Sequence, residues 1–296
     1  MKTNILSIIG ETPLVKTKQL LTNDNLEYFI KLEGHNPGGS VKDRPAFNMI
    51  NEAIKRGEID LNAHLVEATS GNTGIALAYI AAVMGLKLTL VMPESATRER
   101  ILTMRAYGAE VLLTDKERGI EGSRDIADQL VREKDYFMLD QFSNPDNYLA
   151  HYKTTGPEIW KQTNQKITHF VSAMGTTGTI TGVAKYLKEK NPAIRIIGAQ
   201  PEEGSRIPGI RKWNEAYLPK IYDSKYIDEI RYVSAEQASK MANKLARKEG
   251  VFAGMSSGGA AYIATQLGKE LDSGLIVSIA CDRGDRYLSS DLFITG

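Results

Sequence analysis

A lysine follows a glycine-rich turn in segment 38–44, which reads GGSVKDR. A glycine turn that opens a helix offers backbone N–H groups to an anion, and a lysine beside it can bind a phosphate, stay solvated or form a covalent bond. The P-loop spacing is not met, because two residues separate Gly39 from Lys42 and an acidic residue follows the lysine. The segment alone leaves covalent chemistry and a solvated surface lysine open.

Two further glycine-rich turns follow apolar, strand-like segments. TSGNTG at 69–74 follows HLVEA, and GTTGTITG at 175–182 follows HFVSAM. Ligands of open α/β sheets bind at the carboxyl ends of strands, where such turns open helices. The second turn fits a phosphate cradle, since its glycines permit close backbone approach and its threonines add hydroxyl donors. The dinucleotide fingerprint GxGxxG is absent from both turns. One such turn would indicate only a tight bend, whereas three together favour an anion site.

Metal binding and serine hydrolysis find no support in the residue spacing. The histidines lack ligand spacing and the single cysteine, Cys281, has no thiol companion, so we expect no metal site and interpret the histidines as surface or packing residues. The segment GMSSGG at 254–259 meets the GxSxG spacing of a hydrolase, but no clear strand precedes it and no Asp/His pair follows in the expected order. The histidines are His35, His64, His151 and His169.

Composition limits the partners. The 296 residues include 37 basic and 36 acidic ones, and the formal charge of +1 gives no reason to expect nucleic acid or an anionic membrane as a partner. A single cysteine excludes an internal disulfide and, with no signal peptide at the start, predicts a cytoplasmic protein. The apolar run 74–93 is long enough to span a membrane, but Gly85 and Lys87 divide it and favour a buried helix followed by a strand. We therefore expect a small-molecule substrate.

The elements that would position these turns alternate along the chain. Short apolar runs alternate with helical patterns such as 43–56 and 73–84, which predicts an α/β protein whose parallel sheets have helices on both faces. The length predicts two domains, with a boundary near the polar segment 140–147. The expected strands are 26–33, 64–69, 86–93, 109–114, 136–140, 168–174, 194–201, 229–234 and 275–282.

Seven ordered segments resemble those of the cysteine synthase family, most closely its B branch, O-acetylserine sulfhydrylase B. The resemblance covers nearly the whole chain and implies the tryptophan synthase β-like fold called type II. That fold has two three-layer α/β domains with mainly parallel sheets and pyridoxal 5'-phosphate (PLP) in the cleft between them. The implied domains are a smaller, mobile N-terminal one of residues 1–12 and 35–145 and a larger one of 13–34 and 146–296 that binds the PLP phosphate. The segments are KLEGHNPGGSVKDR (31–44), EATSGNTGIALA (67–78), DQFSNPDN (140–147), SAMGTTGTITG (172–182), PEEGSRIPGIRKW (201–213), GMSSGGA (254–260) and CDRGDRYLS (281–289).

The resemblance also implies the role of each site residue. Lys42 would form the Schiff base with PLP and move the α-proton of the substrate, which requires a nucleophilic amine. Asn72 would bind the ring oxygen of the cofactor, and Ser256 would face its pyridine nitrogen. The phosphate would lie in the loop of Gly175, Thr176, Thr177, Gly178 and Thr179, and the substrate carboxylate would be held by Thr69, Ser70, Gly71, Asn72, Thr73 and Gln141.

The implied reaction is a β-replacement. It would form L-cysteine or S-sulfocysteine from O-acetyl-L-serine and sulfide or thiosulfate, through an aminoacrylate. A neutral hydroxyl at Ser256 would leave the pyridine nitrogen largely unprotonated and favour replacement at Cβ over transamination. In the B branch, Arg211, Cys281 and Asp282 are associated with a polar entry for the sulfur donor, and an arginine suits the oxyanion of thiosulfate. A surface salt bridge is the alternative for Arg211, and a packing role is the alternative for Cys281.

Other functions stay open at this point. They are serine or threonine dehydration or cystathionine β-synthesis on the same scaffold, a P-loop hydrolase, and a catalytically silent regulatory relative. The segments RKW and CDRGD and the lack of a regulatory domain argue against another reaction, and the retained lysine, asparagine, serine and phosphate loop argue against a silent relative. By analogy with the family we expect a homodimer, and binding of serine acetyltransferase is left undecided.

Overall fold

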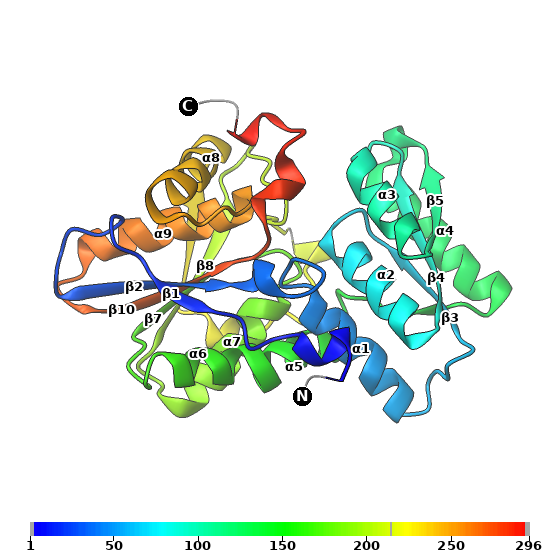
Figure 1. Ribbon diagram of the computed structural model, residues 1–296, viewed down its shortest axis with the longest axis horizontal. Coiled ribbons are helices and arrows are strands. Elements are labelled where there is room, and N and C mark those ends of the chain that lie inside the picture. The colour runs from blue at the N-terminus through cyan, green and yellow to red at the C-terminus, as the bar shows by residue number, and fades with distance from the viewer. Residues whose placement is uncertain (1–2, 214, 294–296) are drawn as a thin grey trace. The chain divides into compact units, whose positions relative to one another are not determined.

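Two compact units make up the chain. The computed structural model describes residues 3–213 and 215–293 (Figure 1). The described residues of the first unit lie within Met1–Ile9 and Lys42–Asn147, and those of the second lie within Gly10–Val41 and Tyr148–Gly296. The chain therefore enters the first unit twice, and its second entry begins at the lysine of the glycine-rich turn. The smaller, mobile domain of 1–12 with 35–145 and the larger, phosphate-binding domain of 13–34 with 146–296 stay a prediction.

The first unit is a parallel sheet covered on both faces. Its strands are β3 (His64–Ala68), β4 (Lys87–Pro93), β5 (Glu110–Thr114) and β6 (Phe137–Met138), and its helices are α1 (Asp43–Lys55), α2 (Asn72–Met84), α3 (Arg98–Ala106) and α4 (Gly119–Lys134). The strand order is β5-β4-β3-β6. Alternate side chains of a strand face opposite sides, so Leu65 joins a core with α1, α2 and α3 while Val66 joins a core with α4.

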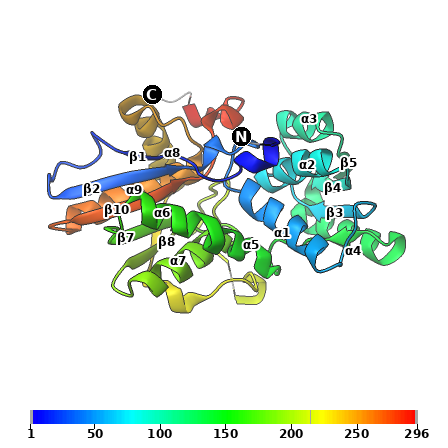
Figure 2. The same ribbon diagram turned by 60° about the horizontal axis from the view of Figure 1, so that its bottom comes forward.

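The second unit has a larger sheet with the same three layers (Figure 2). Its strands are β1 (Leu14–Lys16), β2 (Leu26–Leu32), β7 (His169–Ala173), β8 (Arg195–Pro201), β9 (Glu229–Val233) and β10 (Gly274–Ala280), and its helices are α6 (Gly156–Gln162), α7 (Gly178–Lys190), α8 (Ala235–Lys244) and α9 (Met255–Glu270). The order is β1-β2-β10-β7-β8-β9, and only the β1–β2 pair among these is antiparallel. Ile276 of β10 packs with α8 and α9, and its neighbour Val277 packs with α6 and α7.

Short elements complete the described chain. The chain passes from the first unit to the second within α5 (Pro145–Ala150). Single π-helical turns lie at His151–Thr155 and Leu245–Glu249. Short 3-10 turns lie at Ile5–Ile8, Glu33–His35, Lys116–Arg118, Glu215–Tyr217, Ser224–Tyr226, Gly284–Tyr287 and Asp291–Phe293.

The structure confirms the predicted α/β class with mainly parallel sheets. The apolar run 74–93 divides as expected, because α2 ends before Gly85 and β4 begins at Lys87. Gly85 has φ of 73°, a left-handed conformation that favours glycine. Within residues 3–213 and 215–293, no helix is long and apolar enough to cross a membrane. The expected strand 136–140 is shorter than predicted, since Asp140 has φ of 51° and the ladder stops at Met138.

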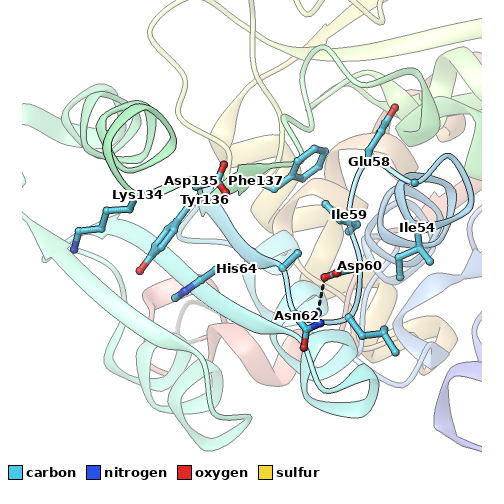
Figure 3. A pocket seen from close by; sticks show the side chains of 13 residues that line it. Ile54, Glu58, Ile59, Asp60, Asn62, His64, Lys134, Asp135, Tyr136 and Phe137 are labelled. Carbon is cyan, nitrogen blue, oxygen red and sulfur yellow. Dashed lines mark hydrogen bonds between the residues drawn. The ribbon is translucent and has the colours of Figure 1, made fainter.

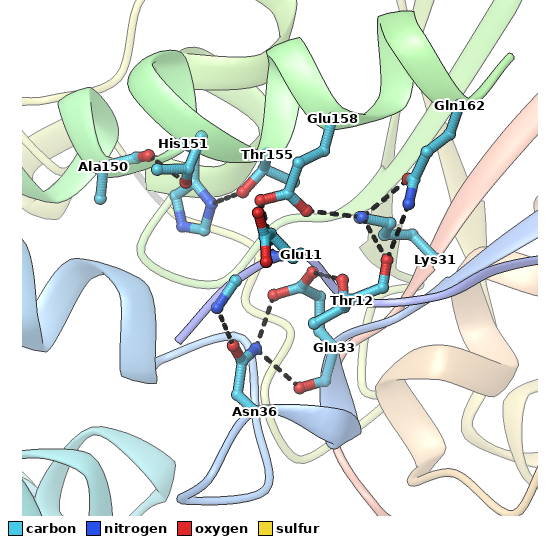
Figure 4. A network of polar contacts seen from close by, with 12 residues as sticks. Glu11, Thr12, Lys31, Glu33, Asn36, Ala150, His151, Thr155, Glu158 and Gln162 are labelled. Atoms are coloured by element: carbon cyan, nitrogen blue, oxygen red, sulfur yellow. Dashed lines mark hydrogen bonds and ion pairs between the residues drawn. The ribbon is translucent and has the colours of Figure 1, made fainter. Parts of the chain in front are cut away.

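A fully buried lysine ties β2 to neighbouring elements of the second unit. Lys31 Nζ donates to Thr12 O at 2.7 Å, Glu158 Oε2 at 2.6 Å and Gln162 Oε1 at 2.8 Å (Figure 4). These three acceptors match the three protons of an ammonium group. The charge is therefore buried with an ion pair and full hydrogen bonding, which is the condition under which burial of a lysine is tolerated.

The same network continues into the segment that precedes Lys42. Glu33 Oε1 accepts from the Thr12 hydroxyl at 2.6 Å, and Glu33 Oε2 accepts from Asn36 Nδ2 at 2.9 Å (Figure 4). Asn36 Nδ2 also donates to Ser40 O at 3.2 Å. The side chains after β2 thus fix the turn that leads to the lysine.

Two neighbouring glycines of α9 give a test of how closely this unit is packed. A Cβ at Gly258 would overlap the carbonyl oxygen of Ala238 in α8, whereas a Cβ at Gly259 would meet only Ile210 Cδ1, at 3.1 Å, and other side-chain atoms. We expect Gly258→Ala to lower the free energy of unfolding by about 1–3 kcal/mol through overpacking. Gly259→Ala, the matched control, should stay within about 1 kcal/mol of wild type, because helix propensity offsets a small side-chain shift. Urea unfolding followed by circular dichroism measures both, and equal losses would contradict the close approach of α8 and α9.

Candidate active site

Lys42 immediately precedes α1 and is half-buried. Two contacts within the second unit hold the residues just before it at the end of β10. The Val41 N–H donates to Cys281 O at 2.7 Å, and Ser40 forms a β-bridge with Asp282. The backbone is therefore held by these contacts up to Val41, the residue before the expected nucleophile.

Asp43, next to the lysine, is completely buried and links α1 to α2. The Tyr79 hydroxyl donates to Asp43 Oδ2 at 3.1 Å. Burial raises the pKa of the Tyr79 phenol well above its usual range, and the negative charge of Asp43 raises it further. Tyr79 therefore stays protonated as the donor that fixes the first turn of α1.

The second glycine turn brings most of the expected carboxylate-binding residues together. It joins β3 to α2, and Gly71 precedes the helix without any side-chain cap. The Thr73 hydroxyl donates to Gln141 Oε1 at 2.8 Å across 68 residues of sequence, and both side chains are buried. Thr69, Ser70, Gly71, Asn72, Thr73 and Gln141 therefore share the start of one helix. An uncapped helix start offers N–H groups and a positive dipole to an anion.

The third glycine turn joins β7 to α7 and contains an unusual threonine. Thr177 is buried, has φ of 69° and precedes α7 without a side-chain cap. Its Oγ1 is buried and has no hydrogen-bond partner. A buried hydroxyl without a partner is costly, and here it lies at an open helix start. A phosphate oxygen would supply that partner, so Gly175 to Thr179 fit a phosphate group.

Two residues outside the motif support this turn. A Cβ at Gly175 would lie 2.5 Å from Gly209 O, so only glycine fits there, and Trp213 Nε1 donates to Gly175 O at 2.8 Å. Gly209 in turn has φ of 88°, and a Cβ there would lie 3.4 Å from Ser256 Oγ. Gly209 thus lies between Ser256 and the third glycine turn, whose residues Gly175 to Thr179 are called the phosphate turn below. Nothing in the sequence motifs indicates this role of Gly209.

His151 is a further residue whose contact the sequence analysis missed. It lies in the π-helical turn, is buried, and its Nε2 is 3.2 Å from Thr179 Oγ1 while its Nδ1 is 2.9 Å from Thr155 Oγ1. It is packed as expected, but it also orients a threonine of the phosphate turn. A lone histidine has no spacing signal, so the sequence could not identify this contact.

Ser256 is the second residue of α9, and it is buried. Gly254, before the helix, faces Asp282, whose Oδ1 would lie 2.5 Å from a Cβ there. The Tyr287 hydroxyl donates to Asp282 Oδ2 at 2.6 Å. Asp282 thus has a structural contact at the start of α9 in addition to the role expected from its motif.

The other two residues expected near the sulfur donor differ in exposure. Arg211 is exposed, and its guanidinium lies 5.3 Å from the ring centre of Trp213, which is a cation–π contact. Cys281 is half-buried and packs against two apolar clusters of the second unit. Its N–H donates to Ser257 Oγ at 2.9 Å. The cysteine environment fits the packing alternative, and the arginine is placed to meet solutes.

A separate cavity of about 830 Å³ lies at the opposite, amino-terminal edge of the first sheet. It is lined in part by His64, the first residue of β3, which stacks on Tyr136 at 3.8 Å between ring centres (Figure 3). Burial lowers the pKa of His64. None of the expected site residues lines this cavity. Among residues 3–213 and 215–293, no group of three His, Cys, Asp or Glu side chains could hold a metal.

The strained threonine predicts an effect on stability in the absence of any ligand. Thr177→Gly relieves a left-handed, β-branched backbone and removes an unpartnered hydroxyl, so the free energy of unfolding should rise by about 1 kcal/mol. Thr179→Gly is the control, because it lies in regular helix and should lower the free energy by about 1 kcal/mol. Urea unfolding of the cofactor-free protein gives both values. Destabilisation by Thr177→Gly would show that the turn carries no strain.

Known proteins are similar to this chain both in sequence and in structure. The family model described as pyridoxal-phosphate dependent enzyme matches residues 5–282. Cysteine synthase B of Pseudomonas aeruginosa is 55% identical, over 98% of this chain and 97% of the relative. The crystal structure of a cysteine synthase from Entamoeba histolytica has a TM-score of 0.95 at 37% identity and covers 100% of this chain and 92% of its own. An O-acetylserine dependent cystathionine β-synthase from Helicobacter pylori has a TM-score of 0.90 at 37% identity, with 99% of each chain covered. The chain therefore belongs to the family of pyridoxal-phosphate-dependent enzymes.

Proposed function

We propose that this protein forms L-cysteine from O-acetyl-L-serine and a sulfur donor, with PLP as its cofactor. The observation that carries the proposal is the buried, unpartnered Thr177 hydroxyl at the uncapped start of α7, in a chain 55% identical to a cysteine synthase B. The turn fits the phosphate, and the relative indicates the reaction. Bound PLP supplies an electron sink for negative charge at the substrate Cα.

The proposed cofactor contacts come from two of the glycine turns and from the start of α9. Gly175, Thr176, Thr177, Gly178 and Thr179 hold the phosphate through backbone N–H and hydroxyl groups. Asn72 would donate to the ring oxygen, and Ser256, which is buried, would face the ring nitrogen. A hydroxyl carries no charge, so it does not keep that nitrogen protonated as a carboxylate would. This arrangement favours replacement at Cβ over transamination.

The start of α2 binds the substrate carboxylate. Thr69, Ser70, Gly71, Asn72 and Thr73 present N–H and hydroxyl groups there, and Gln141 joins them. Because Gln141 Oε1 accepts from Thr73, its Nε2 is the end that donates to the carboxylate. The binding energy of the carboxylate then positions Cα for proton transfer.

Lys42 holds the cofactor covalently and moves the proton. Its Nζ removes the α-proton as acetate leaves from Cβ, and it returns a proton to Cα after sulfur has added at Cβ. Holding one amine beside Cα serves both transfers, which is the advantage of a positioned general base. Its attachment to the end of β10 through Val41 and Ser40 keeps the backbone of the base in place.

The lysine is tested by Lys42→Arg. A guanidinium stays protonated and cannot bind the aldehyde, so the visible absorption band of the lysine-bound cofactor should vanish and turnover should fall by about 10²–10⁴-fold. The matched control is Lys55→Arg at the other end of α1, where an exposed ion pair with Glu52 should tolerate the change. A coloured, active Lys42→Arg enzyme would exclude this role.

For the sulfur donor we propose that thiosulfate is used as well as sulfide. Arg211 is exposed and stacked on Trp213, which itself donates to the phosphate turn at Gly175. A guanidinium is a planar set of N–H donors, which suits an oxyanion such as the outer sulfonate of thiosulfate. We propose further that Cys281 and Asp282 shape this entry and that the protein is a cytoplasmic homodimer.

The donor preference is tested by replacing the arginine. Arg211→Ala should raise the KM for thiosulfate by about tenfold and leave the KM for sulfide within about twofold, because only the oxyanion uses the guanidinium. Lys212→Ala is the control, as it removes a neighbouring charge. Homocysteine is the third arm, since the Helicobacter pylori neighbour favours cystathionine synthesis as the second candidate. Product from homocysteine alone would replace the proposed function with that candidate.

A further inference from the structure

A buried carboxylate stands in the middle of the first sheet, and the proposed reaction does not use it. Glu67 lies in β3, two residues before the second glycine turn, and only 3% of its surface is exposed. A carboxyl group is seldom buried unless it has specific hydrogen bonds to make. Its partners therefore indicate what it does.

The Glu67 side chain accepts hydrogen bonds just beyond the end of the β3–β6 ladder. The last paired residues are Val66 and Met138. Asp140, two residues later, has φ of 51°, a left-handed conformation that does not continue a strand. Glu67 Oε2 accepts that N–H at 3.2 Å, and the carboxyl also accepts the N–H of Gln141. One side chain thus supplies acceptors for two consecutive backbone donors.

The turn held in this way carries the expected substrate-binding amide. Gln141 Oε1 accepts from Thr73 at the start of α2, and Gln141 O accepts from Asn147 Nδ2 at 2.6 Å. Ser143 N–H donates to Asp140 O at 3.0 Å and closes the turn upon itself. Glu67 connects this closed turn to β3, the strand that leads directly into the glycine turn before α2.

The surroundings of Glu67 shift the pKa of its carboxyl group, so its protonation state affects stability. Burial and, to a smaller extent, the negative charge of Asp140 raise the pKa of Glu67 to about 8, although the turn N–H groups and Arg124 of α4 oppose the shift. The folded protein therefore holds a proton here that the unfolded chain releases at lower pH. The stability from this proton is complete at low pH and is lost as pH rises through the folded pKa. Ionisation would place two carboxylates at one buried turn.

We propose that Glu67 is the positioning residue of the Gln141 turn: by accepting the N–H groups of Asp140 and Gln141, it keeps the Gln141 side chain against Thr73 at the start of α2. The proposal rests on the proposed function in one respect, the binding of the substrate carboxylate by Gln141. Loss of the Glu67 contact frees the turn, which weakens amino-acid binding without touching the lysine or the phosphate turn.

The first test uses the cofactor-free protein. Amide hydrogen exchange of segment 139–144 is compared at pH 7 and pH 9.5 in wild type, Glu67→Gln and Glu67→Ala. Glutamine keeps an acceptor and cannot ionise, so the protection of its segment relative to wild type should be about tenfold larger at pH 9.5 than at pH 7. Alanine should lose protection at both values. Glu110→Gln, the same change on β5, is the matched control and should follow wild type.

The second test measures binding of L-serine to the holoenzyme, because L-serine carries the α-carboxylate without a good leaving group. The dissociation constant of wild type divided by that of Glu67→Gln should rise from about one at pH 7 to about ten at pH 9.5. Titration of the ligand amine affects both proteins equally, so it cancels in this ratio. An equal alkaline loss in both proteins, or wild-type binding by Glu67→Ala, would overturn the proposal. If the proposed function itself fails, wild type shows no lysine-bound cofactor or no L-serine binding, while the exchange result still decides the role of Glu67.

Discussion

Two helices, α2 and α7, begin at the carboxyl ends of parallel strands with no side chain capping them. The first N–H groups of any helix need partners, and a protein normally supplies them with a serine, threonine, aspartate or asparagine cap. Here the residues around each helix start are mostly glycines and threonines, and the buried hydroxyl of Thr177 lacks a partner. In the proposed function anions supply these partners, and the remaining architecture keeps both helix starts open to them.

Close backbone approach is one means of keeping that shape. Gly209 lets the phosphate turn and Ser256 lie on either side of one backbone segment, and Gly182 lets α7 approach the carbonyl of Tyr148. The π-helical turn that follows Tyr148 directs His151 at Thr179. Such contacts leave no room for a side chain, so the positions of α7 and α9 are fixed by backbone geometry more than by fitted apolar groups. This rigidity is what an active site requires of its scaffold.

Buried ionisable side chains are the other means of keeping that shape. Lys31, Glu33 and Glu67 each lie in or directly after a strand. Lys31 pairs with Glu158 of α6, whereas Glu33 and Glu67 are hydrogen-bonded to Asn36 and Asp140, in segments next to expected site residues. Burial of these groups has a cost in desolvation that hydrogen bonds must offset. Apolar residues would fill the same space at lower cost, but they would not specify the path of a loop. These ionisable groups therefore serve the geometry of the site more than the stability of the fold.

The sequence by itself determined the α/β class, the division of the apolar run at Gly85 and the three glycine-rich turns, because apolar periodicity and turn chemistry are local properties. It also indicated the family through ordered motifs, and the matching relatives confirm that membership. Only the tertiary structure decided that Thr73 meets Gln141, that Gly209 separates Gly175 from Ser256, and that Glu67 ends the β3–β6 ladder. These contacts join residues far apart in the chain. No spacing rule encodes them, because they arise only where the sheet brings strand ends and turns together.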